Sequence, residues 1–79
     1  MKGAGLERLK WRSRRGLLEL DIIFERFWKN AGGELEDAEA AALERLLQLP
    51  DNDLLDLVMG RAQSPDDQLR TMVHKLRSQ

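Results

Sequence analysis

Apolar residues recur every three or four positions along most of the chain, a spacing that places them on one face of an α-helix. The clearest stripe lies in residues 17–30 and predicts a central helix there. Its members are Leu17, Leu20, Ile23, Phe24, Phe27 and Trp28. Leu6 and Leu9 lie one turn apart, and Ser13 continues their face. These positions predict a shorter first helix over residues 5–14.

A third helix is predicted to start at Glu36 or Asp37. Acidic residues fill its first turn, where they suit the positive end of the helix dipole. The helix is expected to run to Leu49, because Pro50 follows and disfavours its continuation. Its apolar positions are Ala38, Ala42, Leu43, Leu46, Leu47 and Leu49.

Two further helices have start signals in the sequence. Asp51 is interpreted as the N-cap of a short fourth helix, and Gly60 as the residue just after its end. The apolar positions of this helix are Leu54, Leu55, Leu57 and Val58. Ser64 is interpreted as the N-cap of a fifth helix, with Pro65 at its first position and an end near Arg77. The fifth helix is expected to bury Leu69, Met72, Val73 and Leu76.

Glycines separate the first helices. Gly16 interrupts a good helix-forming context, and inside a helix it would cost about 1 kcal/mol relative to alanine. It is therefore either a joint between two helices or a point of close approach. Asn30 and the Gly32-Gly33 pair end the second helix. The pattern predicts an all-α fold, a compact bundle of five short helices in one domain over residues 1–79, with a flexible N-terminus over residues 1–5.

The composition excludes several classes of function. The 79 residues include no Cys and a single His, which excludes a disulfide scaffold, a thiolate metal site and His-based zinc ligation. A chain this short has little room for a deep substrate pocket, which disfavours an autonomous metabolic enzyme. No apolar run approaches the roughly 20 residues of a membrane span, and the N-terminus lacks the apolar stretch of a signal peptide. We therefore expect a cytoplasmic protein without a metal or a membrane partner.

Charge is balanced overall and uneven along the chain. Residues 1–30 carry a net charge of +4, residues 31–60 one of −7, and residues 61–79 one of +2. Five basic residues gather near the N-terminus, namely Arg8, Lys10, Arg12, Arg14 and Arg15. This segregation indicates either an anionic partner for the N-terminal face or attraction between the two halves within the fold. Neither interpretation requires nucleic acid, for which a basic total would be more usual.

The stretch from Trp11 to Asp21 is the strongest candidate for a docking surface. Arginine grips carboxylates or phosphates with two hydrogen bonds, and tryptophan supplies a flat contact surface. Gly16 would let the backbone of a partner approach closely. The candidate binding residues are Arg8, Trp11, Arg12, Arg14, Arg15, Gly16, Glu19 and Asp21. The ordinary structural interpretation is an Arg15–Glu19 pair along a continuous helix, worth about 0.2–0.5 kcal/mol, with Trp11 packed into the core or under Arg15.

Other polar residues are better explained by structure. His74 is expected on the surface, without a catalytic role. The acidic set within residues 51–56 lacks the glycine and glutamate of a calcium-binding EF-hand loop, which favours the capping interpretation. Phe27 and Trp28 are expected in the core. No phosphate-binding glycine loop is present, and no catalytic residue is assigned.

The motif Arg15-Gly16-Leu17-Leu18-Glu19 resembles the R-G-x-x-E signature of the FAD assembly factor (SdhE/YgfY) family, which is related to the mitochondrial succinate dehydrogenase assembly factor. Trp11, Arg14 and Asp21 match its flanking positions. The resemblance covers roughly residues 6–77. Many relatives carry an aromatic residue late in the fourth helix, where this chain has Leu57, and we expect this departure to alter packing.

The resemblance implies an assembly factor rather than an enzyme. Such proteins are compact five-helix bundles that bind the flavoprotein subunit of succinate dehydrogenase and, in bacteria, that of fumarate reductase. They promote covalent attachment of FAD to a histidine of that subunit, with the chemistry lying in the partner and in FAD. The resemblance assigns this function to Arg15, Gly16 and Glu19, and we expect a monomer that holds no FAD tightly.

Two other classes of function remain open from the residues alone. The basic N-terminal face would suit a binder of nucleic acid or of a general acidic partner, with steep salt dependence. An antitoxin-like inhibitory module would bind a partner that is not a flavoprotein.

Overall fold

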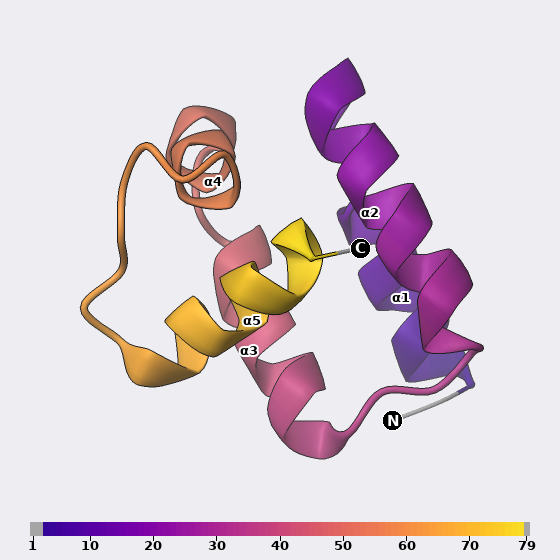
Figure 1. Ribbon diagram of the computed structural model, residues 1–79. Coiled ribbons are helices and arrows are strands. Elements are labelled where there is room, and N and C mark those ends of the chain that lie inside the picture. Colours follow the sequence, from indigo (N-terminus) through magenta and orange to yellow (C-terminus); the bar gives the residue numbers. More distant parts are fainter. Residues whose placement is uncertain (1–2, 79) are drawn as a thin grey trace.

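The computed structural model describes residues 3–78, and these residues form five helices and no strand (Figure 1). The helices are α1 (Ala4–Arg12), α2 (Leu18–Ala31), α3 (Asp37–Leu47), α4 (Asp51–Val58) and α5 (Asp67–Arg77). The prediction of an all-α bundle of five short helices is confirmed, and each helix boundary lies within two residues of its expected place. Of the N-terminal segment expected to be flexible, residues 1 and 2 lie outside the described part, and Ala4 and Gly5 belong to α1.

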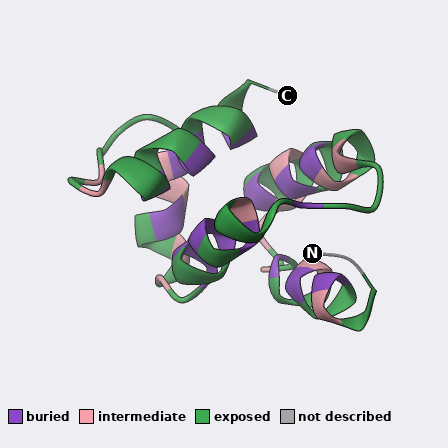
Figure 2. Ribbon diagram, turned by 90° about the horizontal axis from the view of Figure 1, so that it is seen from below, coloured by how far each residue is buried: buried purple, intermediate pink, exposed green. Residues whose placement is uncertain are grey.

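The last helix, α5, packs against three of the other four helices. In Figure 1, α5 (yellow) lies across α3, and it also contacts α2 and α4. α1 packs against α3, and α2 packs against α4. Each helix turns its buried side toward the other helices, as Figure 2 shows. The core comprises Leu6, Leu9, Leu20, Phe24, Phe27, Leu35, Ala40, Ala42, Leu43, Leu46, Leu47, Leu54, Val58, Leu69, Met72, Val73 and Leu76.

Most apolar positions of the predicted stripes are buried, but several residues predicted to be in the core are exposed or only half-buried. Ala38, in the first turn of α3, is exposed rather than buried, although its carbonyl accepts a hydrogen bond from the Gln68 side chain of α5. The residues expected inside that are only half-buried are Leu17, Ile23, Trp28, Leu49, Leu55 and Leu57. Leu35 and Ala40 are buried although the periodicity did not mark them. They occupy the two positions of a hydrophobic staple, the residue before the N-cap and the fourth residue of the helix.

Two predicted N-caps are wrong. Pro50 rather than Asp51 is the N-cap of α4, so Asp51 is the first helical residue. Its carboxylate makes no cap hydrogen bond and lies next to Arg15 instead. The N-cap of α5 is Asp66 rather than Ser64, which leaves Pro65 outside the helix. A charged carboxylate next to the positive end of a helix dipole is a stronger acceptor than a hydroxyl, which accounts for the choice.

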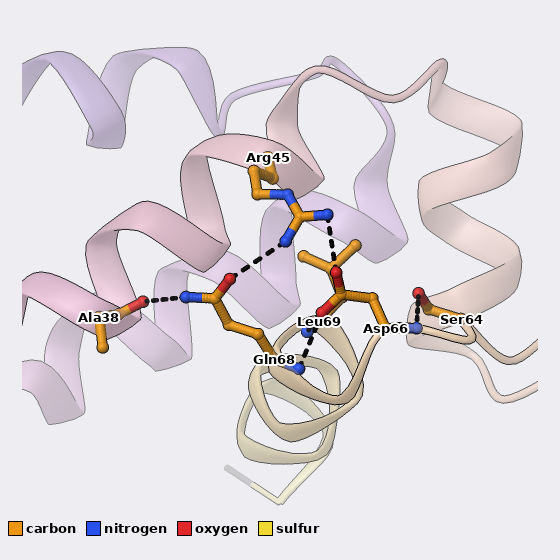
Figure 3. A network of polar contacts seen from close by, with 6 residues as sticks. All are labelled: Ala38, Arg45, Ser64, Asp66, Gln68 and Leu69. Atoms are coloured by element: carbon orange, nitrogen blue, oxygen red, sulfur yellow. Dashed lines mark hydrogen bonds and ion pairs between the residues drawn. The ribbon is translucent and has the colours of Figure 1, made fainter.

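Asp66 also joins α5 to α3 through the network drawn in Figure 3. Its Oδ1 accepts hydrogen bonds from the backbone N–H groups of Gln68 (2.9 Å) and Leu69 (3.2 Å), and the Ser64 hydroxyl accepts one from the backbone N–H of Asp66. Arg45 of α3 places one Nη 2.8 Å from Asp66 Oδ2 and donates from the other to the Gln68 side chain at 3.1 Å. The hydrogen bond from Arg45, followed by the one from the Leu69 backbone, lowers the pKa of the Asp66 carboxyl.

The ends of α2 and α4 are as predicted. Gly32 is the C-cap of α2, and Gly60 follows the C-cap of α4, each with a positive φ. The guanidinium of Arg77 lies directly over Gly60, about 3 Å from where a Cβ would stand. A side chain at residue 60 would therefore displace Arg77.

Candidate partner-binding site

Gly16 lies in the turn that joins α1 to α2. Its φ of +77° belongs to the left-handed region, which costs an L-residue with a side chain roughly 1–2 kcal/mol. A Cβ built at this position would meet no atom within 4 Å apart from those of Gly16 and its two neighbours in the chain. Of the two sequence interpretations, the joint is therefore confirmed, and Gly16 is not a point of close approach between segments of this chain.

Ser13 fixes the start of this turn. It is the C-cap of α1, and it is the buried polar residue of the described core, with 2% of its surface exposed. Its hydroxyl donates a 2.6 Å hydrogen bond to the Lys10 carbonyl and accepts one of 2.9 Å from Nε1 of Trp28 in α2. Lys10 in turn places its ammonium 5.9 Å from the centre of the Trp28 ring. The end of α1 is thus attached to the side of α2.

Arg15 fixes the centre of the turn. Its backbone N–H donates a 3.1 Å hydrogen bond to Asp21 Oδ1 in the first turn of α2. Its guanidinium donates from Nη2 to the carbonyl of Leu47 and from Nη1 to Asp51 Oδ1 at 3.3 Å. The i,i+4 pair with Glu19 does not form, because the helix that would align the two residues is interrupted at Gly16.

The residues around this fixed turn face solvent. Trp11 is 72% exposed, which excludes the interpretation that it packs into the core. The guanidinium of Arg14, rather than that of Arg15, lies over its ring, 5.6 Å from the ring centre. Glu19 is exposed, and no residue of the described chain pairs with its carboxylate. Leu18 is also 75% exposed, a feature that the helical stripe did not reveal.

Of the remaining candidate residues, one is exposed to solvent and one forms an ion pair with another helix. Arg8 is exposed on α1. Arg12 places Nη1 3.5 Å from Glu44 Oε1 of α3, with both side chains about half exposed, so the pair adds little to stability. The pairs of Arg12 with Glu44 and of Arg15 with Asp51 both join the basic N-terminal part to the acidic middle part. Attraction within the fold therefore accounts for part of the charge segregation.

A groove of about 470 Å³ runs beside the turn, between the end of α1 and the middle of α2. Its lining is Lys10, Ser13, Arg14, Asp21, Phe24, Glu25 and Trp28. Because Asp21 and Glu25 share this lining with Lys10 and Arg14, the groove offers both charges beside aromatic rings. Such a lining suits a polar protein segment better than a dianionic phosphate.

The other sequence candidates lie outside this surface. His74 is exposed on α5, as expected. Between residues 3 and 78, no group of three His, Asp or Glu side chains is placed to hold a metal ion. Within the same residues, every helix is too short or too polar to span a lipid bilayer.

Comparison with known proteins gives a family for the chain. Residues 7–79 match the Sdh5 family model, described as "Flavinator of succinate dehydrogenase". The FAD assembly factor SdhE of Shewanella oneidensis is 36% identical over 77 residues, which cover 98% of this chain and 94% of the relative. The Idiomarina loihiensis protein of the same name is 41% identical over 66 residues, which cover 84% and 73% of the two chains.

A third relative has a higher identity over a shorter match. The Ralstonia nicotianae FAD assembly factor SdhE is 57% identical over 54 residues, which cover 68% of this chain and 57% of that relative. No solved structure matches the chain. The relatives are named as assembly factors rather than as catalysts. The chain therefore belongs to the family of FAD assembly factors, maturation proteins of succinate dehydrogenase and not enzymes.

Proposed function

We propose that this chain binds the flavoprotein subunit of succinate dehydrogenase through the surface around Gly16 and promotes covalent attachment of FAD to that subunit. Family membership supports the choice of partner. The observation that carries the choice of surface is the exposed stack of Trp11 and Arg14 beside a turn that the protein holds in place.

Three exposed residues supply the contacts in this proposal. Trp and Arg are the residue types that contribute most to binding energy at protein interfaces. Stacking over Trp11 orders the Arg14 guanidinium before a partner arrives, which reduces the ordering cost of binding. Glu19 offers an unpaired carboxylate to a cation or a backbone N–H of the partner. Arg8 adds positive charge at the edge and serves mainly to speed encounter with an acidic surface.

The role of the chain in this proposal is to position the partner. The bond-forming chemistry is supplied by the flavin of FAD and by a histidine, both within the flavoprotein. By binding one conformation of the subunit more tightly than others, the chain raises the population in which these two groups are aligned. Alignment of two reacting groups lowers a barrier by several kcal/mol without any new catalytic side chain.

We further propose that the chain itself does not hold FAD tightly. The described residues form no parallel sheet with a phosphate-binding turn. In the groove beside Gly16 the carboxylates of Asp21 and Glu25 offset the cations of Lys10 and Arg14, so the lining lacks the net positive charge that would favour the diphosphate of FAD. The residues present therefore do not fit the cofactor, and FAD is expected to enter with the flavoprotein.

The proposal is tested by measuring how much flavin becomes covalently attached to the flavoprotein subunit. The subunit is produced with no added chain, with the wild-type chain, or with Trp11→Ala or Glu19→Gln, then denatured and read for flavin fluorescence on a gel. Met59→Ala is the matched control for Trp11→Ala, because Met59 is also an exposed large apolar residue and lies at the end of α4. We expect a bright band with the wild-type chain and the control, and a weak band with the two surface variants.

Equal fluorescence in every lane would overturn the proposal for this partner. The same assay with the fumarate reductase flavoprotein tests our extension of the proposal to that second partner. Sedimentation of the free chain and of its complex tests the expectation of a monomer that binds one subunit. Tight binding to unrelated DNA with steep salt dependence would favour the nucleic-acid alternative, and capture of a partner without flavin would favour the inhibitory module.

A further inference from the structure

Asp51 lies far from the R-G-x-x-E motif in sequence and next to it in space. It is the first residue of α4, and its Oδ1 lies 3.3 Å from Nη1 of Arg15, 36 residues earlier in the chain. The Arg15 side chain is 17% exposed and that of Asp51 44% exposed. The ion pair is therefore shielded from solvent mainly on its arginine side.

The same guanidinium also contacts the end of the preceding helix. Leu47 is the last residue of α3, and its carbonyl, which has no partner within the helix, accepts a hydrogen bond from Nη2 of Arg15. A cation is favoured at the C-terminus of a helix, and an anion at the N-terminus of the next. Arg15 and Asp51 thus occupy the corner between α3 and α4 with both charges in their favoured places.

We propose that Asp51 is a positioning residue for partner binding, which acts through Arg15 to hold the turn at Gly16. This inference rests on the proposed function. Arg15 is restrained at both ends, by Asp51 and Leu47 at its guanidinium and by Asp21 at its backbone N–H. The neighbours that it holds in place are Arg14 and Gly16, on the exposed surface described above.

Arg15 is more buried than the residues proposed to contact the partner. Its Nε is enclosed by the protein, whereas Glu19 and Trp11 stand in solvent. A partner that lies on this surface meets Trp11, Arg14 and Glu19 first, and the guanidinium of Arg15 remains behind them as their support. Arg15 is therefore assigned a positioning role together with Asp51.

The chain contains a matched control for this inference. Asp53 lies two residues after Asp51 in the first turn of α4, is exposed, and makes no ion pair within residues 3–78. Asp51→Asn and Asp53→Asn therefore remove the same charge from the same end of one helix. Only Asp51→Asn weakens the link to Arg15.

The experiment measures the Kd of each variant for the purified flavoprotein subunit by calorimetry, with circular dichroism to confirm folding. We expect Asp51→Asn to weaken binding by about fivefold and Asp53→Asn to leave it unchanged. Backbone hydrogen exchange of the free chain gives an independent readout, and Arg15 N–H should exchange faster in Asp51→Asn than in Asp53→Asn. Equal Kd values for the two variants would overturn the inference.

A double-mutant cycle separates support from direct contact. If Asp51 acts through Arg15, adding Asp51→Asn to Arg15→Met produces no further loss of affinity. If Asp51→Asn weakens binding equally in both backgrounds, Asp51 touches the partner itself and the positioning role is wrong. A wild-type chain that fails to bind the subunit would instead refute the proposed function, and hydrogen exchange would still test the link between Asp51 and the turn.

Discussion

The indole Nε1 of Trp28 donates a 2.9 Å hydrogen bond to the hydroxyl of Ser13, the residue that caps the end of α1. The same hydroxyl donates to the Lys10 carbonyl. One buried oxygen therefore ends α1 and attaches it to α2, just before the turn at Gly16. This contact, together with the packing of α1 against α3, fixes the orientation of α1 and so the direction in which Trp11 faces.

Replacing Ser13 by alanine is expected to destabilise the fold. The change leaves the Trp28 N–H without its acceptor in a shielded place, and we expect a loss of about 1–3 kcal/mol in the free energy of unfolding. Urea denaturation followed by circular dichroism measures it. Ser78→Ala is the control, because Ser78 also donates to the carbonyl three residues before it but is exposed at the end of α5. A loss as large for Ser78→Ala would show that burial of the Ser13 hydroxyl is unimportant.

Replacing Gly16 by alanine tests backbone strain separately from contact. The added methyl group finds open space, so the expected cost of about 1–2 kcal/mol comes from the positive φ alone. Gly33 has a φ of +85° and equally open surroundings, away from the motif. We expect both alanine variants to lose similar stability and only Gly16→Ala to lose affinity for the flavoprotein. Equal affinity for the two would mean that the turn at Gly16 needs no particular shape.

Replacing a buried aromatic residue and replacing an exposed one should change the free energy of unfolding by very different amounts. Phe27 is 1% exposed, and Phe27→Ala is expected to cost about 3–5 kcal/mol of unfolding free energy. Trp11 is 72% exposed, so Trp11→Ala should leave stability within about 0.5 kcal/mol of the wild type. Thermal unfolding checks both. A marked loss of stability in Trp11→Ala would contradict its assignment to the contact surface.

Asp66 should make stability depend on acid pH. Its pKa in the folded state is lowered from the ordinary 3.8, chiefly by the hydrogen bond from Arg45. The ionised carboxylate therefore stabilises the fold fully above pH 3.8, and this contribution disappears as the pH falls below 3.8 and through the folded-state pKa.

The measurement compares the wild type with Asp66→Asn, which keeps an amide oxygen suited to an N-cap. The melting temperature of the wild type should be higher at about pH 7, and the difference should narrow at about pH 2.5. In an Arg45→Gln background the effect of Asp66→Asn on the melting temperature should shrink at about pH 7, where the Asp66 carboxylate is ionised. A gap that stays constant with pH would mean that Asp66 titrates alike in the folded and unfolded chains.

Local patterns were enough to predict the helices and most of the core. Every helix could be found from apolar spacing because side chains three or four positions apart share a face. The N-caps were harder to predict, since Ser64 and Asp66 are both suitable residue types, and the carboxylate of Asp66 is the one that accepts from the first backbone N–H groups of α5. Leu35 was missed because it precedes its helix, although its place before an acidic N-cap was a usable signal.

The sequence was enough to predict which segment forms the site, but not which distant residues its side chains contact. The motif and its flanking residues stood out by residue type, and Trp11 and Arg14 lie on the exposed surface. Whether Arg15 faced Glu19 or another group could not be decided locally. The answer depends on the Leu47 carbonyl and on Asp51, which lie 32 and 36 residues further along the chain. Helical periodicity gives the face of a residue and not the identity of a distant neighbour.

The position of α5 at the end of the chain affects when the protein can fold during its synthesis. Because α5 packs against α2, α3 and α4, those helices cannot complete the burial of their apolar faces until residues 67–77 have been synthesised. The core of the nascent chain therefore stays incomplete until α5 has been made. A chain that ends before α5 would expose the apolar side chains that α5 covers, and such a fragment would be prone to aggregation and proteolysis.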